Sequence, residues 1–229
     1  MAAAAAAGGL VLLDFWVSPF GQRCRIALAE KKLPYEYSEQ ELLGAKSELL
    51  LRSNPVHKKI PVLLHGGAAV CESLVILEYL DDAFPDTPRL LPAGDPYARA
   101  WARFWGDYVD TKVYPVGTRL WKLGRAGEKA EARAELVEAL RTLDGELGER
   151  RFFGGGDAFG FVDVALVPLM PWVQAFARYG EFSVEEECPR VAAWARRCME
   201  RDSVAKSLRS PEEVYDFIGL LRNYYGVRD

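Results

Sequence analysis

The sequence is poor in residues that bind metals or form disulfides. It has two histidines among 229 residues, and no two of its four cysteines have C-x-x-C spacing: Cys24, Cys71, Cys188 and Cys198. These counts predict no zinc or haem site and favour reduced thiols, and therefore a cytoplasmic protein. Because Cys24 shares a helical stripe with apolar residues, we expect a buried core thiol there and not a nucleophile.

Long hydrophobic runs and a large excess of charge are also absent. The formal net charge is -4, and no stretch approaches the roughly 18 uninterrupted apolar residues typical of a transmembrane helix. The alanine- and glycine-rich residues 1–9 lack the basic region and long hydrophobic core of a secretory signal, which predicts a disordered tail. We therefore expect a protein without nucleic-acid or membrane partners, in which the local cluster Lys58-Lys59 can attract a small anion.

Residues 10–84 alternate between strand-like and helix-like patterns, and their order, βαβαββα, predicts a compact α/β domain. A His65-Gly66-Gly67 turn between two apolar runs indicates an antiparallel hairpin. The expected strands are 10–16, 35–37, 60–64 and 68–71, and the expected helices are 19–31, 43–52 and a segment that begins at Ser73.

Four prolines from Pro85 to Pro96 prevent regular helix and mark a linker at 85–95. Beyond it, residues 96–229 carry apolar residues at helical spacing, which predicts an all-helical domain with its own core. We expect the aromatic members of these stripes to be mostly core residues. The stripes are Trp101, Phe104, Trp105 and Tyr108; Leu136, Leu140, Leu143 and Leu147; Val191, Trp194, Ala195 and Cys198; and Val214, Phe217, Ile218 and Leu221.

Ser18 stands where the first apolar strand runs into Pro19 and an amphipathic helix. Serine followed by proline is a good N-cap and N1 pair, so the Ser18 hydroxyl and the unpaired N–H groups of the first turn converge at the positive end of the helix dipole. A thiolate would be stabilised there. The alternative is that Ser18 caps the helix and does nothing more.

Pro61 interrupts an extended apolar segment, because proline removes a ladder donor. It therefore belongs at a strand start, an edge or a bend, and it is a candidate for a cis peptide bond. This leaves Ile60 with an open backbone edge, with which an extended peptide can pair by strand addition. An ordinary edge strand is the alternative interpretation.

Charged and polar residues flank these segments in an order that fits one ligand. Ser73 can cap its helix while the free N–H groups receive a carboxylate, and Glu72 can meet an ammonium group. Lys46 and Lys59 can hold a second carboxylate. Capping and solvated surface explain each residue singly. Together they describe a short extended molecule with a zwitterionic end, a central thiol and a distal carboxylate, which is the layout of glutathione.

From about Leu10 to the C-terminus, the sequence resembles a plant tau-class glutathione transferase. The resemblance implies a thioredoxin-like N-terminal domain at 10–84, a helical electrophile-binding domain at 96–229, and a homodimer. Five ordered motifs carry it: DFWVSPFG at 14–21, NPVHKKIPV at 54–62, CESL at 71–74, RFWGDYVD at 103–110 and GFVDVAL at 160–166.

The resemblance also implies a role for each candidate residue, with glutathione as co-substrate and no metal. The Ser18 hydroxyl is the catalytic group, and it donates to the glutathione sulfur. Ile60 pairs through its backbone with the cysteine of the tripeptide. The γ-glutamyl end is expected at Glu72 and Ser73, and the glycyl carboxylate at Lys46 and Lys59. Hydrophobic electrophiles, such as herbicide-like haloarenes, are expected among Phe20, Tyr114, Trp121, Trp172, Phe217 and Leu221.

Two other functions remain open from the sequence. A cysteine at the position of Ser18 would support glutaredoxin-like thiol reduction, which serine cannot perform through a mixed disulfide; a glutathione-dependent peroxidase is related to this alternative. A carrier that sequesters hydrophobic ligands without turnover is the second. In the helical part, Gly160 stands where many family members have serine or threonine in a capping box with Asp163, and we interpret Asp163 as structural.

Overall fold

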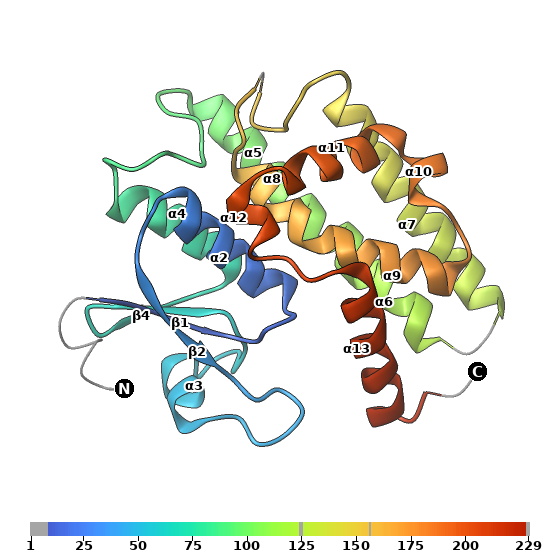
Figure 1. Ribbon diagram of the computed structural model, residues 1–229, viewed down its shortest axis with the longest axis horizontal. Helices are drawn as coiled ribbons and strands as arrows, with labels where there is room; N and C mark the ends of the chain where they lie inside the picture. The colour runs from blue at the N-terminus through green and yellow to red at the C-terminus, as the bar shows by residue number, and fades with distance from the viewer. Residues whose placement is uncertain (1–8, 124–125, 156, 228–229) are drawn as a thin grey trace. The chain divides into compact units, whose positions relative to one another are not determined.

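The computed structural model describes residues 9–123, 126–155 and 157–227 (Figure 1). The chain forms two compact units, the first ending at Ala93 and the second beginning at Gly94. Apart from Gly9, the predicted tail at 1–9 lies outside the described residues.

The first unit is built on a four-stranded sheet in the order β2-β1-β3-β4. β1 (Leu10–Asp14) runs parallel to β2 (Tyr35–Glu39) and antiparallel to β3 (Val62–His65), and β3 forms a hairpin with β4 (Ala68–Cys71). The helices of this unit are α2 (Pro19–Glu30), α3 (Glu48–Ser53) and α4 (Ser73–Ala83). The predicted order βαβαββα is confirmed.

Both faces of this sheet are covered, which is why β1 is a continuous apolar run with no polar alternation. Val11 and Leu13 lie on one face and pack with Val62, Leu64 and Leu50 of α3. Successive side chains of a strand point to opposite faces, so Leu12 lies on the other face, where α2 and α4 pack together (Figure 1).

One helix boundary in this unit differs from the prediction. The segment 43–52 was expected to be helical, but α3 begins only at Glu48. Ser47 is its N-cap, since the Ser47 hydroxyl accepts a hydrogen bond from Leu50 N at 3.0 Å. The start signal was therefore the serine, and the apolar residues before it do not belong to the helix.

The second unit is helical throughout its regular elements. In chain order these are α5 (Pro96–Tyr108), a π-helical turn (Val109–Val113), α6 (Tyr114–Lys122), α7 (Ala126–Leu147), α8 (Phe161–Leu166), a 3-10 turn (Val167–Leu169), α9 (Met170–Gly180), α10 (Val184–Glu187), α11 (Pro189–Met199), α12 (Asp202–Ala205) and α13 (Pro211–Tyr224). The run Phe161–Gly180 is long and apolar enough to cross a membrane by composition, but 89% of that window is buried within the protein, as in a core helix.

The predicted core stripes of this unit are confirmed for α7, and for α11 and α13 apart from the half-buried Ala195 and Leu221, but not for α5. The four leucines of α7 are fully buried. On α5, in contrast, Trp101 is 41% exposed and Phe104 is 51% exposed, with only Trp105 of the stripe's tryptophans in the core. The expectation of a core position was wrong for Trp101 and Phe104 and confirmed for Trp105, because helical spacing marks a shared face and does not say what covers it.

Asp163 holds the start of α8, where Gly160 has no side chain to cap with. The Asp163 carboxylate accepts hydrogen bonds from Gly160 N, Phe153 N, Gly154 N and Trp194 Nε1, at 2.7 to 3.0 Å. Burial raises the pKa of Asp163, and these donors oppose the shift. Its interpretation as a structural residue is confirmed.

Candidate active site

One edge of the sheet gathers the candidate polar residues of the first unit. β1 ends at Asp14 and β3 begins opposite it, because Leu13 pairs with Val62. Val62 also pairs with Cys71, the last residue of β4. The segments that carry Ser18, Ile60 and Ser73 all leave the sheet at this edge, so three stretches far apart in the sequence meet there.

Ser18 is the N-cap of α2. Its hydroxyl accepts a hydrogen bond from Gly21 N at 3.3 Å, its backbone is extended, and Pro19 is the first helical residue. The side chain lies in a sheltered position, since Ser18 is only 7% exposed. A hydroxyl has one proton to donate beyond the bond it accepts, so Ser18 can still donate to an anion at the helix start.

Ile60 stands just before the sheet ladder begins. The peptide bond from Ile60 to Pro61 is cis, as the sequence suggested, and β3 starts at the next residue. Asn54 fixes the loop that leads there, because its amide donates to Lys59 O at 2.9 Å and accepts from His57 N at 3.1 Å.

Glu72 and Ser73 open α4, but not in the way the sequence predicted. Ser73 was expected to cap the helix; the N-cap is Glu72, in the left-handed region at φ 70°, and its side chain makes no capping bond. The hydroxyl of Ser73, which is buried, instead accepts a hydrogen bond from Arg23 Nη1 at 3.0 Å. The fully buried guanidinium of Arg23 needs an acceptor, which explains why Ser73 turns toward α2.

The two candidate lysines belong to the same loop region as Ile60. Lys59 precedes Ile60 in the chain, and Lys46 Nζ donates to Lys58 O at 2.7 Å. Glu72 lies near this basic segment, with Glu72 Oε1 3.9 Å from His57 Nε2. Positive groups thus lie on the 46–59 side of the sheet edge and one carboxylate at the α4 side.

Cys24 lies on α2, about 1.7 helical turns beyond Ser18, and is fully buried. Burial raises the pKa of its thiol far above the ordinary range, and the nearby Asp14 carboxylate adds to this effect. The prediction that Cys24 is a core residue is confirmed.

The aromatic candidates divide between the two units. Phe20 lies on α2 of the first unit. In the helical unit, the Trp172 ring contacts Tyr114 at a centroid distance of 5.6 Å and Phe217 at 6.2 Å. Trp121 and Trp172 are 3% and 2% exposed, so both are core residues, whereas Leu221 is half-buried. Burial raises the pKa of Tyr114 to about 12, so its phenol stays protonated at neutral pH.

Known proteins match both units of the chain. Residues 12–88 match the family described as glutathione S-transferase, N-terminal domain, and residues 126–197 match glutathione S-transferase, C-terminal domain. The chain is 65% identical over 226 residues to a probable glutathione S-transferase, GSTU1, of Oryza sativa subsp. japonica, with 95% of this chain and 97% of the relative covered. The chain belongs to the glutathione S-transferase family.

Solved structures agree on the fold and the class. The structure of rice GST1 (OsGSTU1) in complex with glutathione has a TM-score of 0.90 and 64% identity, covering 93% of this chain and 98% of that one. The tau-class glutathione S-transferase of mango, Mangifera indica, has a TM-score of 0.87 and 36% identity, covering 94% and 99%. This chain is therefore a tau-class glutathione transferase with a thioredoxin-like N-terminal domain and a helical C-terminal domain.

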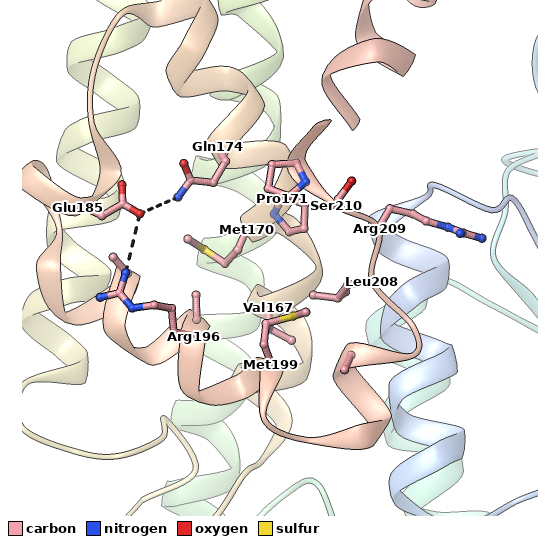
Figure 2. A pocket seen from close by; sticks show the side chains of 14 residues that line it. Val167, Met170, Pro171, Gln174, Glu185, Arg196, Met199, Leu208, Arg209 and Ser210 are labelled. Carbon is pink, nitrogen blue, oxygen red and sulfur yellow. Dashed lines mark hydrogen bonds and ion pairs between the residues drawn. The ribbon is translucent and has the colours of Figure 1, made fainter. Parts of the chain in front are cut away.

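The transferase has a further cavity within its helical unit, of about 400 Å³ (Figure 2). Met170, Val167, Met199 and Leu208 form its apolar part. At one side, Gln174 donates a hydrogen bond to Glu185 at 3.2 Å, and Arg196 forms an ion pair with the same carboxylate at 3.9 Å. None of the predicted electrophile residues lines it. At about 100° per residue, Met170 and Gln174 lie on the opposite face of α9 from Trp172.

Sequence reasoning missed two residues that hold the candidate site in place. Arg23 anchors Ser73, and Asn54 shapes the loop before Ile60. Asn54 had a signal, because asparagine before proline favours a turn. Arg23 had none, since an arginine in an amphipathic helix is ordinarily on the solvent side.

Proposed function

We propose that Ser18 donates its hydroxyl hydrogen bond to the sulfur of bound glutathione and keeps that sulfur deprotonated. The observation that carries this proposal is the place of Ser18: its hydroxyl caps a sheltered helix start at the sheet edge that Ile60 and Ser73 share. Ile60 pairs with the cysteine backbone of the tripeptide, Glu72 and Ser73 receive the γ-glutamyl end, and Lys46 and Lys59 receive the glycyl carboxylate.

The energy required is within reach of this arrangement. A free thiol has a pKa of about 8.5, and lowering it by about two units corresponds to about 2.7 kcal/mol. A helix N-terminus stabilises a nearby anion by about 0.3–1 kcal/mol, and up to about 2 in sheltered geometry. A hydrogen bond to a charged group contributes about 1.5–3 kcal/mol. The two effects together supply the shift.

The reaction that follows is nucleophilic attack by the thiolate on an electrophilic carbon. The thiol proton passes to solvent, a carbon–sulfur bond forms, and a leaving group such as chloride departs with the electron pair of its bond. In additions to an activated alkene no group leaves, and the carbon next to the one attacked is protonated. The proposed substrates are hydrophobic electrophiles, herbicide-like haloarenes among them. The residues proposed to bind them are Phe20, Tyr114, Trp121, Trp172, Phe217 and Leu221.

Replacing Ser18 tests the proposal. Ser18→Ala removes the hydroxyl's share of the thiolate stabilisation, about 1.5–3 kcal/mol, so kcat/KM for a chlorinated nitroarene should fall about 10- to 100-fold at a pH below the thiol pKa of the wild-type complex. Its stability should fall by only about 1 kcal/mol, the usual cost of losing an N-cap. Near-normal conjugation by this variant would remove the assigned role. Turnover of a disulfide substrate by the wild type at a comparable rate would favour the thiol-reductase alternative.

We also propose a homodimer in the cytoplasm, as is typical of the family. The exposed aromatic face of α5 supports the dimer, because Tyr97, Trp101 and Phe104 stack in sequence and are 41–75% exposed. Phe104→Glu should shift the mass in sedimentation toward the monomer. An unchanged mass would exclude this face from the subunit contact.

The cavity of Figure 2 favours a second function, the binding of apolar molecules without turnover. Its lining residues on α9 lie on the opposite face of that helix from Trp172, so a molecule in the cavity leaves conjugation unblocked. Ala195→Phe, which fills the cavity, should abolish the apolar dye binding that occurs in this cavity and leave kcat/KM for conjugation unchanged. Full dye binding by that variant would place the dye elsewhere.

A further inference from the structure

The loop between β1 and α2 carries Ser18. Two side chains from outside this loop form hydrogen bonds with the backbone N–H and C=O groups of Trp16. The Trp16 N–H donates to Glu39 Oε1 at 3.1 Å. The Trp16 carbonyl accepts from Arg25 Nη2 at 2.9 Å. Glu39 is the last residue of β2 and Arg25 lies on α2, so the loop is fastened to two different elements.

Glu39 and Arg25 are themselves fixed. Arg25 Nε lies 3.0 Å from Asp14 Oδ2, and Asp14 is fully buried at the end of β1. Tyr37 links the two: its hydroxyl donates to Glu39 Oε2, and its ring lies 5.8 Å from the Arg25 guanidinium. The donor and the acceptor that hold Trp16 are therefore anchored to the sheet.

Asp14 also contacts the first turn of the helix that Ser18 caps. A Cβ at Gly21 would lie 1.6 Å from Asp14 Oδ1, so only glycine lets the helix start approach this carboxylate. The Gly21 N–H is the group that Ser18 caps. The same packing thus brings the Asp14–Arg25 pair and the Ser18 cap together.

We propose that Glu39 and Arg25 are positioning residues, which clamp the Trp16 peptide groups and so set the place of the Ser18 hydroxyl two residues later. The inference rests on the proposed role of Ser18. A hydrogen bond weakens steeply as its length and angle depart from the optimum, so a small loop displacement lowers the share of thiolate. The residues proposed to hold the ends of glutathione lie outside this clamp, so its affinity should change little.

Glu39→Ala is the main test, because Glu39 is exposed and its loss spares the core. It should raise the apparent pKa of the glutathione thiol, read from the pH profile of kcat/KM and from thiolate ultraviolet absorbance in the binary complex, by about half a unit to one unit. Below that pKa, kcat should fall about three- to tenfold, while KM for glutathione stays within about twofold of wild type. At high pH the two profiles should converge.

Glu41→Ala is the matched control. Glu41 is a nearby exposed glutamate whose carboxylate also accepts a backbone N–H, from Leu43 at 2.8 Å, so the control removes the same charge and the same kind of bond. Glu39→Gln keeps an acceptor for Trp16 N–H and should restore most of the wild-type profile. In Arg25→Lys the single nitrogen can keep the pair with Asp14 but does not span to Trp16 O as well, so this variant should give a thiol pKa between those of wild type and Glu39→Ala.

An unchanged thiol pKa in Glu39→Ala, or an equal shift in Glu41→Ala, would overturn the clamp. Ser18→Ala, measured in parallel, separates the two proposals. If Ser18→Ala shifts the thiol pKa and Glu39→Ala does not, the clamp alone is wrong. If Ser18→Ala itself leaves the thiol pKa unchanged, the proposed function is wrong.

Discussion

In the unit that ends at Ala93, the candidate site residues come from turns and helix starts at one sheet edge, whereas in the helical unit they come from the faces of long helices. Strand ends and helix starts place Ser18, Ile60 and Ser73, and the neighbouring residues in the sequence indicate these local structures. Trp172 and Phe217 are placed by packing against each other. Polar residues in turns can therefore indicate a site from the sequence alone, whereas aromatic residues on helices occur both in cores and in pockets.

The contrast predicts that replacing a buried polar residue of the helical unit should lower the stability of the protein more than its activity. Asp163→Ala would leave four donors without their acceptor, three of them on buried residues, and each buried group left unpaired costs about 1–3 kcal/mol. We expect a loss of about 4 kcal/mol or more in the free energy of unfolding, measured by denaturant titration. Asp157→Ala, which removes an exposed carboxylate, should cost little; a comparable loss in both variants would contradict the assigned role.

Replacing a buried polar residue of the first unit should affect glutathione binding as well as stability. Arg23→Met keeps much of the side-chain volume but removes the donor to the Ser73 hydroxyl. With Ser73 no longer held, KM for glutathione should rise about tenfold, with a smaller change in kcat. Lys31→Met is the control, since Lys31 is also buried and pairs with Asp81 at 2.7 Å away from the sheet edge that carries Ser18. Equal KM values for glutathione in Arg23→Met and Lys31→Met would contradict the prediction.

How far the sequence predicts each unit follows from the same contrast. The order of strands and helices along the first unit, the Ser18 cap and the cis proline were readable, because glycine, proline and serine impose local geometry. The partners of Arg23 and Arg25 were not, since long-range side-chain contacts have no local signature. On α5, spacing alone could not show that Trp101 lies exposed while Trp105 is buried.

Asp14 makes the stability of the first unit depend on pH. Burial raises the pKa of Asp14 to about 7, against 3.8 for the ordinary carboxyl, although Arg25 opposes the shift and Glu39 adds to it. Between these values the native protein holds a proton that the unfolded chain lacks. The contribution to stability is therefore present at low pH and lost as pH rises toward 7, by about 1.4 kcal/mol per pH unit.

Asp14→Asn should remove this dependence. Relative to wild type, the variant should gain about 2–3 kcal/mol in the free energy of unfolding between about pH 5 and about pH 8. Denaturant titrations at several pH values measure this change, and any effect of the substitution that does not vary with pH cancels in it. A difference that stays flat with pH would mean that Asp14 is ionised across this range.

The smallest effect is expected at the most ambiguous positions, the apolar residues of α13. Leu221 is half-buried, and Val214 on the same helix is fully buried. If Leu221 lines an electrophile pocket, Leu221→Ala should raise KM for an apolar electrophile about three- to tenfold, because each buried methylene group is worth about 0.8 kcal/mol and the side chain is only half-buried. KM for glutathione should stay constant. Val214→Ala should instead lower Tm and leave both KM values alone, as a core truncation does. The pair therefore separates lining from packing on one helix, the distinction that helical spacing cannot make, and identical behaviour of the two variants would assign Leu221 to the core.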